Sequence, residues 1–148
     1  SRYYSTRSNG PLSSKEAVSL SDVQYAPTRS LTIRDSKIHG RGLFARNGGI
    51  RAKRVVGIYE GVPVSEADAA QGYDMRYVCM TSRGMIDAKP LSCNMKYINH
   101  AKGSLSNVIT RELYADGRIF VITARRIRAE EELLLDYGVD YIYTHNME

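Results

Sequence analysis

The chain of 148 residues has no tryptophan, two phenylalanines, three histidines and two cysteines. Cys79 and Cys93 stand alone in the sequence, so they form neither a disulfide framework nor the paired ligands of a zinc site, and we expect reduced thiols. His100 has no second His or Cys at ligand spacing, so no metal site is expected. No apolar run approaches the roughly 20 residues of a membrane-spanning helix, so no membrane association is expected.

Tyrosine and positive charge are abundant instead. The eleven tyrosines suit half-buried β-strands, and they could equally line a binding channel. The formal net charge is +5, which favours acidic partners such as nucleic acid or the acidic faces of nucleosomes. The lysines and arginines are scattered along the sequence, however, and scattering is more typical of a solvated basic surface.

The length predicts one domain with an arm in front of it. Residues 1–28 show little periodicity, and their first half is rich in Ser, Arg and Tyr. This composition predicts an arm, flexible or partly ordered, and it also fits the remnant of a transit peptide. The domain is predicted over residues 29–143, followed by a short tail at 144–148.

Many short strands are predicted within the domain. Asp116-Gly117 separates two alternating runs, 108–114 and 118–123, which is a strong hairpin signal. Ser65 predicts the N-cap of a short helix over 66–70. Further strands are predicted at 31–33, 54–64, 73–80, 85–88 and 133–137, with a tight glycine turn at 40–42. The fold class is therefore mostly β with few short helices.

Four segments hold residues suited to binding or catalysis. They are Gly40-Arg41-Gly42, Tyr59-Glu60-Gly61, Ile98-Asn99-His100 with Asn107 beyond it, and Glu131-Glu132 followed by 133–137. Closely spaced glycines let a backbone approach a ligand. Taken singly, each segment is more often a plain turn, a core tyrosine, a loop with polar caps or a strand end. Their order along the chain is more informative than any one of them.

In this order the segments resemble the SET domain of protein lysine methyltransferases, over roughly residues 31–143. That family carries a Gly-x-Gly segment, a Tyr-x-Gly strand, an Asn-His segment and a Glu-Leu-x-x-Asp-Tyr segment. The resemblance implies small curved sheets with a C-terminal pseudoknot, in which the last segment threads under a loop. It also implies S-adenosylmethionine as methyl donor and a narrow channel through which the target lysine enters from the opposite face.

The resemblance assigns roles residue by residue. Tyr137 corresponds to the catalytic tyrosine of the family. The residues expected to line the lysine channel are Tyr59, Tyr73, Leu135 and Tyr141. Those expected to bind the cofactor are His39, Gly40, Arg41, Gly42, Tyr73, Lys96, Asn99, His100 and Tyr137. Lys96 stands where the family usually has Arg, so it offers the cofactor carboxylate a point charge without a bidentate fork.

Three departures from the family pattern bear on function. No cysteine follows the third or fourth segment, so the zinc-binding tail of many members is missing; Tyr141 and Tyr143 are expected to close the channel or to pack in a terminal strand. Ile58 replaces the acid usual before the channel tyrosine, as in the PR-type subfamily, some of whose members have weak activity. Leu135 stands where many members have Phe or Tyr, and our hypothesis is that it permits di- or trimethylation.

The resemblance implies a protein lysine N-methyltransferase that acts on a histone tail or on another lysine-containing protein. The alternative is a catalytically weak or inactive SET module that binds protein or nucleic acid, which Ile58 and the basic charge motivate. An intracellular location is expected, with the nucleus favoured and an organelle or a host-cell nucleus as alternatives. Small SET proteins sometimes dimerise, but no residue pattern here demands an oligomer.

Overall fold

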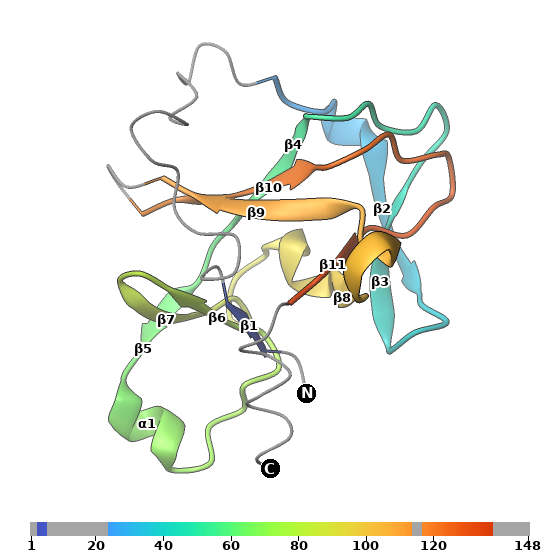
Figure 1. Cartoon of the computed structure of the whole chain (residues 1–148). Helices are drawn as coiled ribbons and strands as arrows, with labels where there is room; N and C mark the ends of the chain where they lie inside the picture. The colour runs from blue at the N-terminus through green and yellow to red at the C-terminus, as the bar shows by residue number, and fades with distance from the viewer. Residues whose placement is uncertain (1–2, 6–23, 114–116, 138–148) are drawn as a thin grey trace.

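The computed structural model describes residues 3–5, 24–113 and 117–137. Its strands are short and, within these ranges, fall into three sheets (Figure 1). The strands are β1 (Tyr3–Ser5), β2 (Leu31–Asp35), β3 (Arg41–Ala45), β4 (Val55–Tyr59), β5 (Val62–Val64), β6 (Val78–Thr81), β7 (Gly84–Asp87), β8 (Asn99–His100), β9 (Val108–Glu112), β10 (Ile119–Thr123) and β11 (Leu134–Leu135). The predicted mostly-β class is confirmed.

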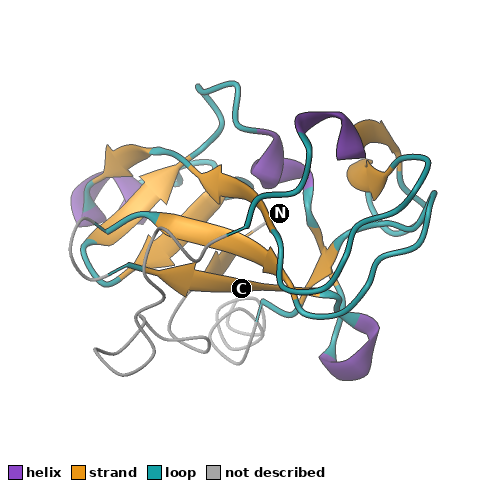
Figure 2. Ribbon diagram, turned by 90° about the horizontal axis from the view of Figure 1, so that it is seen from above, coloured by secondary structure: helices purple, strands orange, loops and turns teal. Residues whose placement is uncertain are grey.

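Helices are few and short, and loops join most of the strands (Figure 2). They are α1 (Glu66–Ala70) and 3₁₀ helices at Thr28–Ser30, Asn94–Tyr97 and Gly103–Leu105. Ser65 caps α1 as predicted, because its hydroxyl accepts the Asp68 backbone N–H at 3.1 Å. No helix in the described part of the chain is long and apolar enough to cross a membrane.

The largest sheet has the strand order β4-β10-β9-β11-β8. β9 and β10 form the predicted antiparallel hairpin, in register from Ile119 opposite Glu112 to Thr123 opposite Val108. Residues 114–116 of its turn lie outside the described residues. Side chains alternate along β9, and those of Val108, Thr110 and Glu112 are buried. The hairpin therefore contributes buried side chains to the core.

Two smaller sheets flank it. One has the order β1-β6-β7-β5, in which β1 pairs in parallel with β6 through Tyr3 and Val78. β1 thus lies inside the segment that the sequence predicted as an arm. The other sheet is the antiparallel pair β2-β3. The Gly-x-Gly segment lies at the start of β3 in this pair, whereas Tyr59 lies at the end of β4 in the largest sheet.

β11 lies between β8 and β9 and runs parallel to both (Figure 1). Loop 101–107 already joins β8 to β9, so the C-terminal strand passes between two strands that the chain has connected earlier. The loop bonds to β11 at both ends: Ala101 N–H donates to Leu135 O at 3.1 Å, and Asn107 N–H donates to Leu134 O at 2.8 Å. The position of β11 between β8 and β9 agrees with the threading that the family resemblance implied.

The core joins all four motif-bearing segments. Leu43, Tyr59, Ile98, Leu135 and Tyr137 belong to one buried cluster. Burying such side chains stabilises a fold by about 1.5–3 kcal/mol each. Of the predicted site residues, Tyr59, Leu135 and Tyr137 belong to this core, whereas His39 and Gly40 lie in the exposed loop between β2 and β3.

Two predictions about local structure are wrong. The strand predicted at 73–80 begins only at Val78, because the Asp74 carboxylate accepts the Arg76 backbone N–H at 3.1 Å and holds a turn there. The glycine turn predicted at 40–42 ends earlier: Gly40 has φ +47° and turns the chain, but Gly42 lies inside β3. Gly42 is needed for close approach, since a Cβ there would lie 2.3 Å from a Glu132 carboxylate oxygen.

Candidate functional site

Asn99 on β8 connects three distant parts of the chain. Its side-chain amide donates to the carbonyl oxygens of His39 at 3.1 Å and Arg41 at 3.3 Å, and to the Glu132 carboxylate at 2.8 Å. Only 2% of Asn99 is exposed, so these bonds form away from water. The predicted cofactor residues His39, Arg41 and Asn99 are therefore brought together, and the oxygens around Asn99 are all hydrogen-bond acceptors.

Glu132, the third hydrogen-bond partner of Asn99, is itself fixed by further contacts. We call this group of contacts around Asn99 the junction. The Ser36 hydroxyl donates to both of its carboxylate oxygens at 2.9 Å. Its backbone lies against β3, where Leu133 N–H donates to Leu43 O at 2.8 Å and Phe44 pairs with Glu132. Glu132 thus brings a negative charge to within hydrogen-bonding distance of Asn99, next to the Gly-x-Gly segment.

His100 and Tyr137 form a second contact between the third and fourth segments. Their ring centroids lie 5.0 Å apart, and Tyr137 N–H donates to His100 Nδ1 at 3.0 Å. An imidazole that accepts at Nδ1 is neutral and carries its proton on Nε2. Tyr137 is 1% exposed, and its hydroxyl donates to the Ile98 carbonyl at 2.6 Å. Hydrogen bonds therefore fix both the backbone N–H and the hydroxyl of Tyr137.

Tyr59 lies in the same buried cluster as Tyr137 and Leu135. Its hydroxyl donates to the Tyr77 carbonyl at 2.5 Å. Burial raises the pKa of Tyr59 far above its ordinary value, and the nearby Cys79 and Tyr137 add to this rise. The Tyr59 phenol therefore stays protonated near neutral pH. Two channel residues predicted from the sequence, Tyr59 and Leu135, thus share one apolar environment with the predicted catalytic tyrosine.

Tyr73 and Lys96, two further residues predicted to bind the cofactor, contact residues other than those around Asn99. The Tyr73 hydroxyl donates to the Asp87 carboxylate at 2.6 Å, and this bond raises the pKa of Tyr73. The Lys96 ammonium donates to the Leu91 carbonyl at 2.9 Å and lies 5.4 Å from the Tyr97 ring centroid. These contacts attach Tyr73 to the end of β7 and hold Lys96 within the segment between β7 and β8. Tyr141 and Tyr143 lie outside the described residues.

The geometry agrees with the sequence comparison. A model of the SET domain family matches residues 40–138, which is more than half of the chain. The chain belongs to the SET-domain family. A search of curated proteins finds no match. The family generally consists of protein lysine methyltransferases that use S-adenosylmethionine.

In this SET domain, two structural residues were not singled out for a role by the sequence. Ser36 lies outside the four segments, and Glu132 lies in the fourth segment, where the sequence assigns it no role of its own. Asn107, noted only for its position after His100, is fully buried and donates to the Glu132 carbonyl at 2.8 Å while accepting the Leu134 N–H at 2.8 Å. The sequence could have indicated a structural role for Asn107, because the polar groups of a buried loop need hydrogen-bond partners within the protein.

The predicted cofactor site cannot be located from pocket volume. A pocket of about 710 Å³ lies along residues 125–131, and none of the predicted cofactor residues lines it. The convergence of polar groups around Asn99 is the better guide, since it joins the segments that the family pattern shares. Among the described residues, no group of three or more His, Cys, Asp and Glu side chains could hold a metal ion.

Proposed function

We propose that the chain is an S-adenosylmethionine-dependent protein lysine N-methyltransferase. The observation that carries the proposal is the junction at Asn99, where segments around His39 and Glu132, more than half the chain apart, meet the Asn-His segment. Membership of the SET family supplies the reaction class. The junction supports the proposal because it is built from the residues that the family pattern shares.

The residues present fit the cofactor. The carbonyls of His39 and Arg41 and the Glu132 carboxylate offer acceptors for a cationic amino group. Gly40 has no atom within 4 Å of the position that a Cβ would occupy, so the backbone is open to a ligand there. We assign the methionine part to 39–42 and Asn99, and the adenine end to His100. When bound, the cofactor supplies an electrophilic methyl group on a sulfonium.

The chain's own residues would prepare the lysine. Its amine needs a free lone pair, whereas a free lysine has a pKa of about 10.4. Entry among buried side chains such as Tyr59, Leu135 and Tyr137 disfavours the ammonium and excludes water. The Tyr137 hydroxyl, held at Ile98 O, is the group that we assign to orienting the amine toward the methyl carbon.

Leu135 is the residue that we assign to product specificity. It is 2% exposed and packs in the cluster that contains Tyr59 and Tyr137. Because it has no hydroxyl, it cannot anchor water beside the amine, and we propose that di- and trimethylated products form. Leu135→Tyr should shift the products toward monomethyl-lysine in a mass-spectrometric time course. An unchanged product distribution would remove Leu135 from this role.

The substrate class proposed first is a histone tail, and we propose the nucleus as the location that goes with it. An extended basic peptide suits a strand-like substrate groove, and other lysine-containing proteins come next. The second candidate, a non-catalytic SET module, is favoured by the half-buried Ile58 on β4, where family members usually carry an acid. Both candidates can be tested in one series of experiments.

Calorimetric binding of S-adenosylmethionine and methyl transfer to a histone mixture should be measured side by side. Binding with transfer supports the enzyme. Binding without transfer to histones directs the search to other protein substrates, with a protein extract as the next acceptor. Absence of both binding and transfer, in a protein whose circular dichroism shows it folded, contradicts the proposal and favours the non-catalytic module.

A further inference from the structure

The fold gathers arginines that are far apart in the sequence. A pocket of about 490 Å³ is lined in part by Arg29, Arg51, Arg54 and Arg126. The pocket of about 710 Å³ beside it is lined in part by Arg125, Arg126 and Arg128. Because Arg126 lines both, the two hollows adjoin. We call these residues the arginine face: Arg29, Arg51, Arg54, Arg125, Arg126 and Arg128.

Two β-bridged loops form the scaffold of this face. Ile50 and Ile127 exchange two backbone hydrogen bonds of 2.8 Å, which join the loop before β4 to the loop after β10. Gly49 makes the close approach feasible: its φ is +64°, and a Cβ there would lie 2.3 Å from the Ile127 carbonyl. The guanidinium groups therefore project from a fixed backbone, which reduces the entropy lost when they bind a partner.

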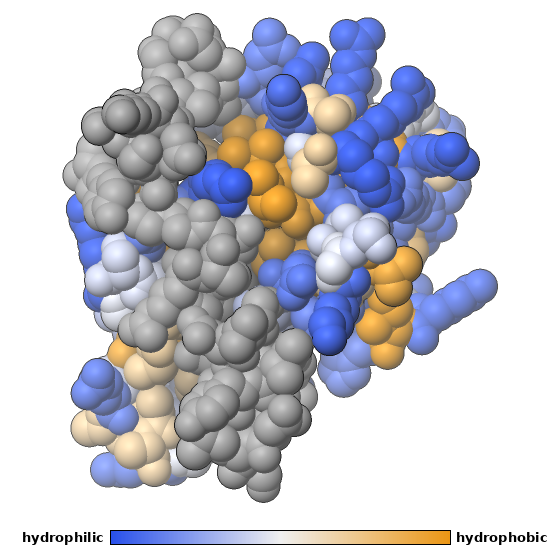
Figure 3. Space-filling view, in the orientation of Figure 1, coloured by the Kyte–Doolittle hydropathy of each residue, from blue (hydrophilic) through white to orange (hydrophobic). Residues whose placement is uncertain are grey.

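Most of the charge on the arginine face is unpaired within the described residues. The side chains of Arg29, Arg51, Arg126 and Arg128 are exposed, and none forms an ion pair with a described residue. The molecular surface over these two loops is mostly hydrophilic (Figure 3). Like charges around two adjoining hollows repel one another, so a bound anion would stabilise this arrangement.

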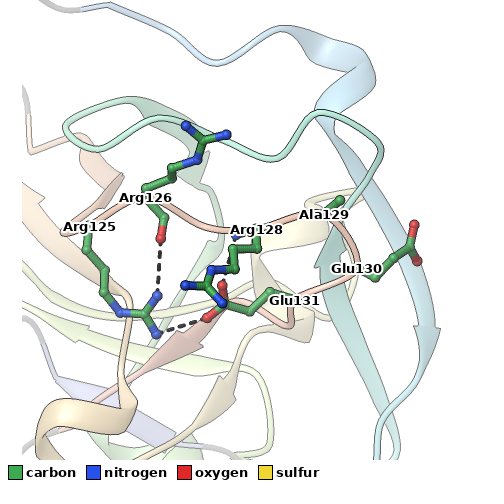
Figure 4. A pocket seen from close by; sticks show the side chains of 6 residues that line it. All are labelled: Arg125, Arg126, Arg128, Ala129, Glu130 and Glu131. Carbon is green, nitrogen blue, oxygen red and sulfur yellow. Dashed lines mark hydrogen bonds and ion pairs between the residues drawn. The ribbon is translucent and has the colours of Figure 1, made fainter.

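The carboxylates beside the arginine face already have partners. Arg125 lies 2.9 Å from Glu131, and Glu130 lies 2.7 Å from Arg34 outside the face. In Figure 4 the Arg126 side chain points away from the Arg125–Glu131 pair. Partial burial works to raise the pKa of Glu131, but hydrogen bonds from Arg125 and its other neighbours hold this pKa below its ordinary value. The face is therefore positive at neutral pH.

The chemistry of the arginine face points to one class of partner. A planar guanidinium donates two parallel hydrogen bonds to a phosphate, which a lysine cannot do. The large hydrophobic side chains exposed in the described residues are Tyr25, Ile38, Val62 and Leu105, and none lines either hollow. Protein partners and single-stranded nucleic acids are generally held by aromatic or apolar anchors, which this face lacks.

We propose that the arginine face binds the phosphate backbone of double-stranded nucleic acid. Such binding is independent of base sequence, because phosphate contacts position a protein without reading bases. The inference goes beyond methyl transfer and does not depend on it. For an enzyme acting on chromatin, it would hold the catalytic domain close to DNA-wrapped substrates.

The test is fluorescence anisotropy of a short labelled DNA duplex titrated with the full chain, without S-adenosylmethionine, at several salt concentrations. The variant is Arg126→Gln/Arg128→Gln. The matched control is Lys37→Gln/Lys102→Gln, which removes the same charge from two exposed positions outside the face. Arg128→Gln alone serves if the double variant does not fold, as judged by circular dichroism.

Each phosphate contact contributes about 0.9 to the slope of log affinity against log salt concentration, or roughly eightfold in affinity near 0.1 M salt. The arginine variant should therefore bind at least about tenfold more weakly, with a slope smaller by about 1–2, while the control changes little. Equal losses in both double variants would overturn the proposal. So would tighter binding to single-stranded RNA or to an acidic protein segment at the same salt concentration.

Discussion

Exchanging one atom in the Asn99 side chain should have a large effect on stability. Asn99→Asp keeps the shape of the side chain but replaces its donating NH₂ with an acceptor. The three atoms that receive hydrogen bonds from Asn99, namely His39 O, Arg41 O and a Glu132 carboxylate oxygen, would then face a second carboxylate. Since the site is 2% exposed, water cannot screen the repulsion effectively.

The magnitude follows from two contributions. The amide has two N–H donors, so about two hydrogen bonds are lost: one to a neutral carbonyl, worth about 1 kcal/mol, and one to a charged group, worth about 1.5–3 kcal/mol. Repulsion between the new carboxylate and Glu132 adds a further cost. This cost cannot exceed the free energy needed to keep one carboxyl protonated. Keeping a carboxyl of ordinary pKa near 4 protonated at pH 7 costs about 4 kcal/mol, and at pH 5 only about 1.4 kcal/mol.

The new carboxyl therefore has a raised pKa in the folded state. Such a group destabilises the fold increasingly as pH rises above its unfolded pKa, until the folded pKa is reached. The free energy of unfolding of Asn99→Asp, measured in urea relative to the parent protein, should thus improve by about 2–3 kcal/mol between pH 7 and pH 5. Asn99→Ala, which adds no charge, should show no such pH dependence.

The control for this experiment is Asn94→Asp, at an exposed position outside the junction. It should change the free energy of unfolding by less than about 0.5 kcal/mol at either pH. If Asn99→Asp were as stable as this control at pH 7, or if its deficit did not shrink at pH 5, the reasoning about the Asn99–Glu132 junction would be refuted.

Three further predictions concern single positions and are measured by urea unfolding. Gly42→Ala should cost about 1–3 kcal/mol, because its Cβ would displace the Glu132 carboxylate; an unchanged midpoint would contradict this close approach. Glu130→Gly should gain about 0.5–1 kcal/mol, because Glu130 has φ +69° and its ion pair with Arg34 is exposed; a loss would show that the pair outweighs the strain. Glu131→Gln should cost more at pH 7 than near pH 3, since a carboxyl with a lowered pKa stabilises above its ordinary pKa and loses that effect in acid. A pH-independent cost would argue against the lowered pKa.

The order of motifs made much of the site predictable. Asn99, His100 and Tyr137 were expected to meet because the family pattern pairs their segments, and the structure places β8 beside β11. The hairpin around Gly117 and the cap at Ser65 were also predictable, since both depend on local turn and capping chemistry. These features are encoded within a few residues or within a family pattern.

Other features depend on long-range packing and could not be predicted. Glu132 meets Ser36 across most of the chain; the sequence places Glu132 in the fourth segment but gives no sign that Ser36 approaches it. The strand predicted from Tyr73 failed because a single Asp74 side chain competes with the sheet for a backbone N–H. Arg29, Arg51, Arg54, Arg125, Arg126 and Arg128 are scattered in sequence, and long-range contacts such as the Ile50–Ile127 bridge bring their segments together.

The most direct test of the central claim is transfer of a labelled methyl group from S-adenosylmethionine to lysine, located by mass spectrometry, in wild type and Tyr137→Phe. Removing the Tyr137 hydroxyl leaves the Ile98 carbonyl without its buried donor, which should cost only about 1–3 kcal/mol of stability, so the variant can be compared as a folded protein. We expect a specific methylated lysine in wild type and at least about a hundredfold loss of transfer in the variant. Equal transfer by both folded proteins would contradict the role of Tyr137 in methyl transfer.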